Sequence, residues 1–320
     1  MLIKEMEYNN RITIEDFASS IGVDTADISD DCRRMIAKTD LRYRVLEGAE
    51  LNKVILDVLK RIDSDRQKIA SPGRRLEWQM GWEENLADFI QQGHAPEALT
   101  PKFLRKNQIM RFNKQYILPA NPNFERDYFS IFRLWLFTKY FKSYDVVYDF
   151  GCGSGFNLLA LARLYPNKRL YGLDFVESSI KLINKIRDVC GTNMEGMFFD
   201  MASPDENLKI ESNGAIFTSG SIEQLGGQFE KFLQFLLRRS PGICVHIEPI
   251  LELYREDNML DSLAIKFHKK RGYTAGYLTR LRELEAKGEI EIIKVKRPFF
   301  GSLFMEGYSL IIWKPKPMIT

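Results

Sequence analysis

The sequence predicts an α/β protein with a doubly wound, mostly parallel sheet of seven strands, preceded by an all-helical N-terminal domain. Three observations carry this prediction. From about residue 144 onward, short apolar runs of strand length alternate with helical segments. The first of these runs leads into a glycine-rich turn and then directly into a helix. The last two runs are joined by a loop too short for a helical crossover, which predicts an antiparallel pair at the sheet edge.

The second part of the chain contains seven apolar runs and five clear helical segments. Alternating strands and helices imply right-handed crossovers and helices on both faces of a parallel sheet. The expected strands are 146–150, 169–175, 194–199, 214–219, 242–247, 289–295 and 307–313. The expected helices are 158–165, 178–189, 229–239, 257–270 and 274–287.

The first part of the chain reads as helices without strands. Apolar residues recur at helical spacing in 49–62, and an aromatic-rich helix is expected over 76–91. For Trp78 and Trp82 in that helix, packing in the core is favoured over direct substrate contact. We therefore divide the chain into a helical lid or substrate domain, 1–120, and a second domain, 121–320. The aromatic helix 125–141 is expected to couple the two.

Composition excludes several classes of protein. The net charge is +3 and the sequence pI is about 8.5, too balanced to indicate nucleic acid as a partner. The four cysteines are scattered without a CxxC pair, so neither a metal centre nor a disulfide framework is expected. No apolar segment has the length of a signal peptide or a membrane span. We expect a cytoplasmic protein that does not bind membranes, with a homodimer left open.

The turn after the first expected strand predicts a ligand site. It reads Asp149-Phe-Gly151-Cys-Gly153-Ser-Gly155, and the helix begins immediately. Glycines let the backbone turn sharply and approach a ligand closely, and the exposed amides at the helix start attract partly negative groups. The spacing is GxGxG rather than the GxGxxG of dinucleotide-binding turns.

This turn, with its acidic residue two positions before the first glycine, resembles motif I of the class I (Rossmann-like) S-adenosylmethionine-dependent methyltransferases of small-molecule type. The resemblance covers about 123–320 and implies S-adenosylmethionine as cofactor, with S-adenosylhomocysteine as product. It implies that the Asp174 carboxylate accepts hydrogen bonds from the ribose hydroxyls, that Asp200 reaches the adenine amine, and that Ser219 borders the methionine part. The implied cofactor residues are Asp149, Gly151, Gly153, Gly155, Asp174, Phe175, Asp200, Met201 and Ser219.

Candidates for chemistry on the acceptor follow from the fifth strand. Alternation places Cys244, His246 and Glu248 on one face, and the last two lie at the carboxyl end where ligands bind in such sheets. His246 and Glu248 are the candidate catalytic residues, although a buried histidine bonded to a neighbouring element is the competing interpretation of His246. Gln224 stands where related enzymes often have a histidine. Candidate substrate residues are Glu223, Tyr254, His268, Arg271 and Tyr273. A solvated helix end is the competing interpretation of the charged run 268–273.

These observations predict methyl transfer to an oxygen or nitrogen of a small molecule such as a sugar, an amino acid or a natural-product intermediate. The alternatives are a protein, peptide or RNA methyltransferase and a catalytically silent cofactor-binding protein. Against modification of a base amine, the fourth strand ends in Thr-Ser-Gly-Ser without the Pro-Pro-aromatic motif that clamps a flipped base. There is no Pro-Cys pair to supply a covalent nucleophile for C5-pyrimidine methylation.

Overall fold

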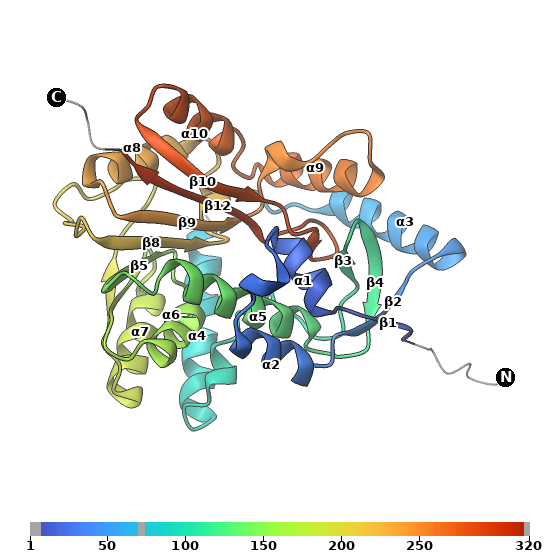
Figure 1. Ribbon diagram of the computed structural model, residues 1–320, viewed down its shortest axis with the longest axis horizontal. Coiled ribbons are helices and arrows are strands. Elements are labelled where there is room, and N and C mark those ends of the chain that lie inside the picture. Colours follow the sequence, from blue (N-terminus) through green and yellow to red (C-terminus); the bar gives the residue numbers. More distant parts are fainter. Residues whose placement is uncertain (1–7, 70–73, 317–320) are drawn as a thin grey trace.

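The computed structural model describes residues 8–69 and 74–316, which form two sheets flanked by helices (Figure 1). The helices are α1 (Ile14–Ile21), α2 (Asp30–Lys38), α3 (Gly48–Ser64), α4 (Arg74–Gln91), α5 (Phe124–Tyr140), α6 (Phe156–Leu164), α7 (Glu177–Cys190), α8 (Phe229–Arg239), α9 (Met259–Arg271) and α10 (Tyr277–Ala286). The strands are β1 (Asn10–Arg11), β2 (Arg42–Val45), β3 (Met110–Phe112), β4 (Gln115–Pro119), β5 (Val146–Phe150), β6 (Arg169–Asp174), β7 (Met194–Phe198), β8 (Gly214–Ser219), β9 (Ile243–Glu248), β10 (Ile290–Lys296), β11 (Phe300–Gly301) and β12 (Ser309–Pro315).

The seven-stranded sheet confirms the predicted fold class. Its strand order is β10-β12-β9-β8-β5-β6-β7. The strands β9, β8, β5, β6 and β7 run parallel, whereas β12 pairs antiparallel with both β9 and β10. The final strand therefore enters the sheet between β9 and β10. Because β12 runs against β9, its first residue, Ser309, lies opposite Glu248 at the carboxyl edge of the parallel strands.

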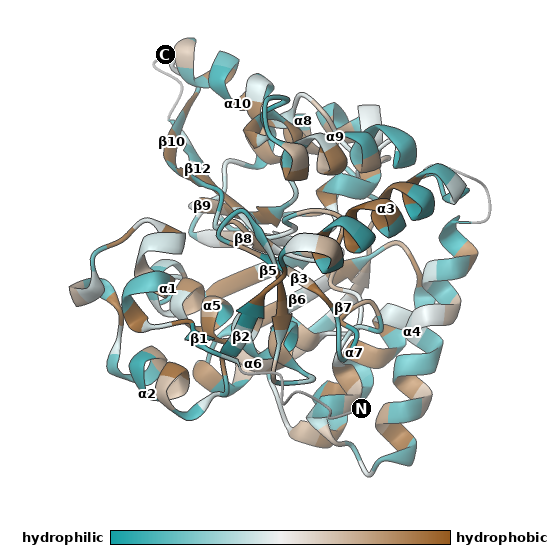
Figure 2. Cartoon of the chain, turned by 90° about the vertical axis from the view of Figure 1, so that its right-hand side faces the viewer, coloured by the Kyte–Doolittle hydropathy of each residue, from teal (hydrophilic) through white to brown (hydrophobic). Residues whose placement is uncertain are grey.

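Both faces of this sheet are covered, and the alternation predicted for β9 is present. Ile243, Val245 and Ile247 pack in the core shared with α5, α6 and α7. Cys244 faces the other core, which α8 and α10 cover. Figure 2 shows the hydrophobic central strands enclosed by these helices.

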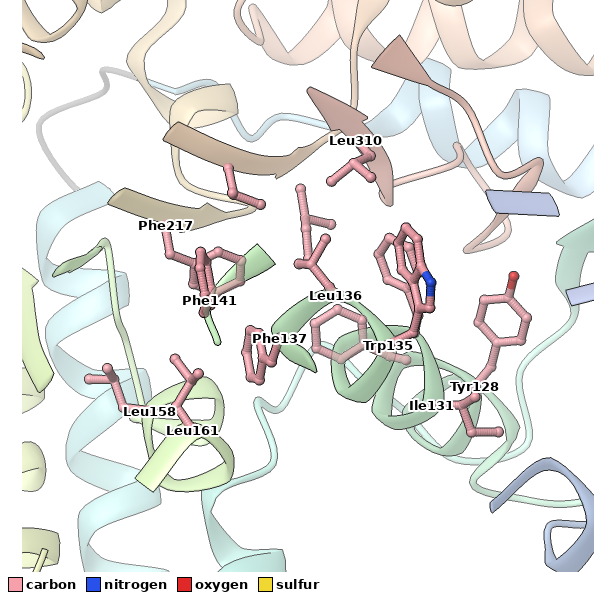
Figure 3. Close-up of a cluster of buried hydrophobic side chains, with 14 of the residues drawn as sticks. Tyr128, Ile131, Trp135, Leu136, Phe137, Phe141, Leu158, Leu161, Phe217 and Leu310 are labelled. Atoms are coloured by element: carbon pink, nitrogen blue, oxygen red, sulfur yellow. The ribbon is translucent and has the colours of Figure 1, made fainter. Parts of the chain in front are cut away.

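The helix α5 couples the N-terminal part to the sheet, as its aromatic sequence predicts. Trp135, Leu136 and Phe137 are 1% exposed or less, and they point from α5 toward Phe217 and Leu310 of the sheet (Figure 3). The same cluster includes buried side chains of α1 and α2. Burial on several sides explains why a helix with charged residues is so rich in aromatic side chains.

The expectation of an all-helical N-terminal domain is wrong in one respect: the region is mainly helical but contains a small antiparallel sheet. Its order is β1-β2-β4-β3-β11, and β11 comes from the loop between β10 and β12. Asn113 and Lys114 make the turn between β3 and β4 with positive φ angles of 47° and 62°. Strands of two to five residues are too short to show a period-2 pattern in the sequence.

Buried ion pairs join the small sheet to the C-terminal part. Arg297 binds Asp261 of α9 and, at 2.9 Å, Glu306, and the guanidinium of Arg111 on β3 lies 3.6 Å from Glu306. All four side chains are 7% exposed or less, so removing one would leave its partners as uncompensated buried charges. Within the described ranges, no helix combines the length and apolar character needed to cross a membrane.

Candidate active site

A cavity of about 350 Å³ lies at the carboxyl edge of the parallel strands. Its floor is the turn after β5 together with the ends of β6, β7 and β8. Seven of the nine residues expected to hold the cofactor line it: Gly151, Gly153, Asp174, Phe175, Asp200, Met201 and Ser219. Strand ends that are far apart in the sequence meet here because parallel strands place their carboxyl ends at one edge.

The glycine turn adopts a backbone conformation that side chains disfavour. Gly151, Gly153 and Gly155 have φ angles of 74°, 52° and 72°. A Cβ on Gly151 would lie 2.4 Å from the Ser221 Cβ, and one on Gly155 would lie 2.5 Å from Cδ1 of Ile183. Gly155 caps the start of α6 and does not line the cavity, so its contribution is to the shape of the turn.

Asp174 at the end of β6 is tied to the glycine turn. Its Oδ2 accepts a hydrogen bond of 2.9 Å from the Gly153 amide, and its Oδ1 accepts one of 3.3 Å from the Val176 amide. Burial raises the pKa of the Asp174 carboxyl to about 6. Asp174 also lines the cavity, so its carboxylate lies where it can meet a bound hydroxyl.

Asp149 lies behind the turn and does not line the cavity. It is 1% exposed, and both carboxylate oxygens lack a hydrogen-bond partner among the described residues. Burial and the neighbouring Asp174 and Glu248 raise the pKa of the Asp149 carboxyl well above its usual value. An unpartnered buried carboxyl is costly unless water or a ligand supplies a donor.

Two tryptophans of α4 form the opposite wall of the cavity. From the sequence, packing in the core was the favoured interpretation of both. The rings of Trp78 and Trp82 stack with centroids 5.5 Å apart, and the Arg74 guanidinium lies 4.6 Å from the Trp78 ring centre. The Ser178 hydroxyl of α7 donates to the Gln79 carbonyl oxygen at 2.9 Å. This bond places α4 over the turn, and nothing local in the sequence indicates it.

A third wall contains Phe129, Phe156 and Tyr308. Tyr308 immediately precedes β12, and its hydroxyl donates a 2.9 Å hydrogen bond to Oε1 of Glu125 in the first turn of α5. Glu125 is 7% exposed, and burial raises the pKa of its carboxyl to about 7. This pair is not predicted from the sequence; its only local signal is an isolated acid at the start of a very apolar helix.

His246 lies in the core beneath the cavity rather than in its wall. The ring is fully buried, and its Nε2 accepts from the Trp313 indole at 2.9 Å and from the Tyr277 hydroxyl at 3.1 Å. The Nδ1 atom must then carry the proton, which it donates to Thr218 Oγ1 at 2.9 Å. Burial lowers the pKa of His246 to about 3. This histidine has no free nitrogen with which to accept a substrate proton, in contrast to the expected catalytic role.

Glu248 holds a backbone segment rather than facing the cavity. It is 1% exposed, and its carboxylate accepts from the amides of Ser221, Ile222 and Glu223 at 3.1 to 3.3 Å. These bonds fix the turn after β8, whose residues Ser219 and Ser221 line the cavity. Burial raises the pKa of the Glu248 carboxyl to about 7.

None of the five expected substrate residues is among the described residues that line the cavity. The His268 ring contacts Tyr254 and Tyr273 edge to face, with ring centroids 5.6 Å and 5.5 Å apart, in the packing around α9. Arg271 binds Asp65 at 2.7 Å and the Tyr273 hydroxyl at 3.1 Å. Glu223 accepts from the Gln224 amide at 2.7 Å, and it is Gln224 that lines the cavity.

The residues around the cavity fit the cofactor implied by the glycine turn. The turn brings the backbone to the cavity at Gly151 and Gly153, and carboxylates stand at the ends of β6 and β7 where hydroxyl and amine donors would bind. Behind the turn, the two carboxyl oxygens of Asp149 have no hydrogen-bond partner among the described residues. The carboxylates and the apolar side chains around the cavity therefore suit a ligand with ribose hydroxyls, an amine and apolar parts.

Comparison with known proteins finds similarity at the level of structure. No protein-family model matches the chain, and no curated protein sequence matches it. The [4+2]-cyclase SpnF has a TM-score of 0.52 at 13% identity, over 79% of this chain and 99% of that chain. PigF with S-adenosylhomocysteine has a TM-score of 0.47 at 16% identity, over 83% and 71%. Human N-acetylserotonin methyltransferase with S-adenosylmethionine has a TM-score of 0.46 at 10% identity, over 94% and 74%.

At these identities, the similarity concerns the fold alone. The order of the sheet supplies the specific evidence: five parallel strands, a glycine turn after β5, and a last strand inserted antiparallel between β9 and β10. Nicotinamide-binding Rossmann domains end on parallel strands instead. The chain therefore has the class I, Rossmann-like fold of the S-adenosylmethionine-dependent methyltransferases.

Proposed function

We propose that the protein is an enzyme that binds S-adenosylmethionine and transfers its methyl group to an oxygen or nitrogen of a small molecule. The observation that carries this proposal is the single cavity in which the glycine turn, Asp174, Asp200 and the α4 tryptophans meet. Its volume of about 350 Å³ lies within the range of about 300–1,000 Å³ typical of small-molecule sites. We propose that residues 1–120 act as the lid, since α4 covers the turn.

When bound, the cofactor supplies an activated methyl group on a positively charged sulfur. The protein itself would then position the two reactants and exclude water from the site. Holding two reactants in line can lower a barrier by about 7–11 kcal/mol. The apolar walls from Trp82, Phe129 and Phe156 exclude water, and Asp174 with the glycine turn orients the nucleoside. A mainly apolar cavity of this volume favours a small acceptor over a peptide or RNA strand.

The fold alone does not settle the reaction, because SpnF is described as a [4+2]-cyclase. The first experiment is therefore calorimetry with S-adenosylmethionine and S-adenosylhomocysteine, followed by release of S-adenosylhomocysteine from methyl-labelled cofactor. Separate pools of sugars and nucleotide-sugars, amino acids and amines, phenolic compounds, peptides, and RNA serve as acceptors. We expect binding, and turnover with one small-molecule pool.

Two variants sharpen this experiment. Asp174→Ala should weaken cofactor binding and slow turnover, whereas Asp188→Ala, an exposed aspartate on α7, is the matched control and should do neither. Absence of cofactor binding in the unaltered protein would overturn the proposal. Turnover with only peptide or RNA would replace the small acceptor with a macromolecule. Binding without turnover on any pool would instead favour a reaction other than methyl transfer.

A further inference from the structure

The site described above lacks one component of an oxygen methyltransferase, a group that removes the acceptor's proton. His246 and Glu248, which the sequence favours, both use their polar atoms to hold the protein together. Asp174 is engaged with the glycine turn. The proton acceptor must therefore be sought among the other polar groups in the cavity wall.

Tyr308 and Glu125 form such a group. Tyr308 lines the cavity, and its hydroxyl points its hydrogen at Glu125 Oε1, 2.9 Å away. The phenol oxygen keeps a lone pair, so it can accept a hydrogen bond from a hydroxyl in the cavity while donating to the carboxylate. Ser309, the next residue, lies opposite Glu248, which places Tyr308 at the carboxyl edge of the sheet beside the end of β9.

The burial of Glu125 makes its charged carboxylate form energetically costly. The side chain is 7% exposed and forms no ion pair among the described residues; its hydrogen-bond partner is Tyr308. Glu125 faces one titratable group, Tyr308 from the segment before β12. Tyr308 in turn faces Glu125 and Tyr128, both from α5. Glu125 does not line the cavity itself; its hydrogen-bond partner Tyr308 does. A buried carboxyl with a shifted pKa and one specific partner next to a cavity is a candidate functional group.

We propose that Tyr308 is a catalytic residue that takes the proton of a hydroxyl acceptor and passes its own proton to Glu125, which acts as the positioning residue and final proton acceptor. This inference rests on the proposed function and assigns oxygen as the methylated atom. The acceptor oxygen forms a bond to the methyl carbon with its lone pair, the carbon–sulfur bond breaks, and that electron pair stays on the now neutral sulfur. The acceptor's proton moves to the Tyr308 oxygen as the Tyr308 hydroxyl proton moves to Glu125.

The first test needs no acceptor. Infrared spectra of the protein with S-adenosylhomocysteine, recorded against Glu125→Gln, isolate the protonated carboxyl band of Glu125. We expect this band to disappear with a midpoint near pH 7, because burial raises the pKa of Glu125 to about 7. In Tyr308→Phe the midpoint should move to higher pH, because the hydroxyl that stabilises the carboxylate is gone. A band that persists to pH 9 in the unaltered protein would overturn the proposal.

The second test measures turnover with the acceptor pool that the unaltered protein methylates. Tyr308→Phe keeps the ring contacts with Phe129 and Phe300, at 5.1 Å and 5.5 Å, and removes only the hydroxyl. We expect kcat to fall by about 10²–10⁴-fold with unchanged cofactor affinity, and the deficit to shrink as the pH approaches the pKa of the acceptor. Glu125→Gln, which can accept the hydrogen bond but not the proton, should behave similarly.

The matched control is Tyr165→Phe, because that hydroxyl bonds the Phe137 carbonyl oxygen at 3.4 Å and Tyr165 does not line the cavity. It should retain full turnover. Turnover by Tyr308→Phe within twofold of the unaltered protein would reject the Tyr308 role and leave the methyltransferase proposal intact. If the unaltered protein fails to bind the cofactor or to release S-adenosylhomocysteine, the proposed function itself fails.

Discussion

The indole ring of Trp82 packs directly on Gly153. A Cβ built on this glycine would lie 2.6 Å from Cζ2 of the indole, closer than non-bonded carbons approach. Gly153 also donates its amide hydrogen to Asp174. Gly153 in the glycine turn thus contacts both α4, through Trp82, and the end of β6, through Asp174.

Gly153→Ala should therefore disturb both the backbone and the α4 contact. The φ of 52° disfavours any side chain, and the new methyl group must displace Trp82. We expect cofactor affinity to fall more than tenfold and stability to fall by about 1–3 kcal/mol, the usual cost of overpacking. Calorimetry and urea denaturation measure the two effects. The control Gly227→Ala adds its methyl group in open space, so equal losses in both variants would contradict this explanation.

Cofactor binding should depend on pH through Asp174. Burial raises the pKa of this carboxyl to about 6, and the carboxylate is the form that accepts hydrogen bonds from ribose hydroxyls. Affinity for S-adenosylhomocysteine should accordingly be complete above pH 7 and decline as the pH falls through 6. In Asp174→Asn the affinity should be weaker at pH 7.5 and should lose most of this dependence. An unchanged pH profile in the variant would assign the titration to another group.

Ligand binding should be visible in tryptophan fluorescence. Of the four tryptophans, Trp78 and Trp82 line the cavity, whereas Trp135 and Trp313 are buried in the two cores. Titration with S-adenosylhomocysteine should change the emission of the unaltered protein. Combined Trp78→Phe and Trp82→Phe should remove most of the change, and Trp135→Phe should preserve it. A change carried by Trp135 would place ligand binding elsewhere or imply movement in the core.

His246 should matter for stability rather than for chemistry. In His246→Leu the Trp313 indole and the hydroxyls of Thr218 and Tyr277 lose their partner, and each unsatisfied buried group costs about 1–3 kcal/mol. We expect the free energy of unfolding to fall by about 2–4 kcal/mol if the polar groups partly relax. Affinity for the cofactor should stay within about threefold. Loss of turnover at unchanged stability would restore a direct catalytic role.

The same histidine predicts a direction for acid denaturation. Its pKa is lowered to about 3 in the folded protein, so between about pH 3 and 6.5 the unfolded chain binds a proton that the folded chain does not. The free energy of unfolding contributed by His246 is therefore complete above pH 7 and decreases as the pH falls below 6.5. Urea midpoints from pH 5 to 8 should show a shallower acid decline in His246→Leu than in the unaltered protein.

Local features of the chain were enough to predict the sheet, the glycine turn and most of the residues that line the cavity at the carboxyl edge. The apolar runs and the turns between them predict local structure. The parallel topology then places Asp174, Asp200 and Ser219 at one edge of the sheet. The two other residues expected at the cofactor site do not line the cavity, because Asp149 is buried behind the turn and Gly155 caps the start of α6.

The other walls of the cavity depend on contacts between segments that are distant in sequence. Trp82 meets Gly153 because α4 docks on α7, and Tyr308 meets Glu125 because the last strand enters the sheet beside β9, next to α5. No local spacing encodes such a meeting. A histidine on a strand is likewise a candidate base until the tertiary structure shows which groups surround it. Around His246, Tyr277 and Trp313 already occupy Nε2.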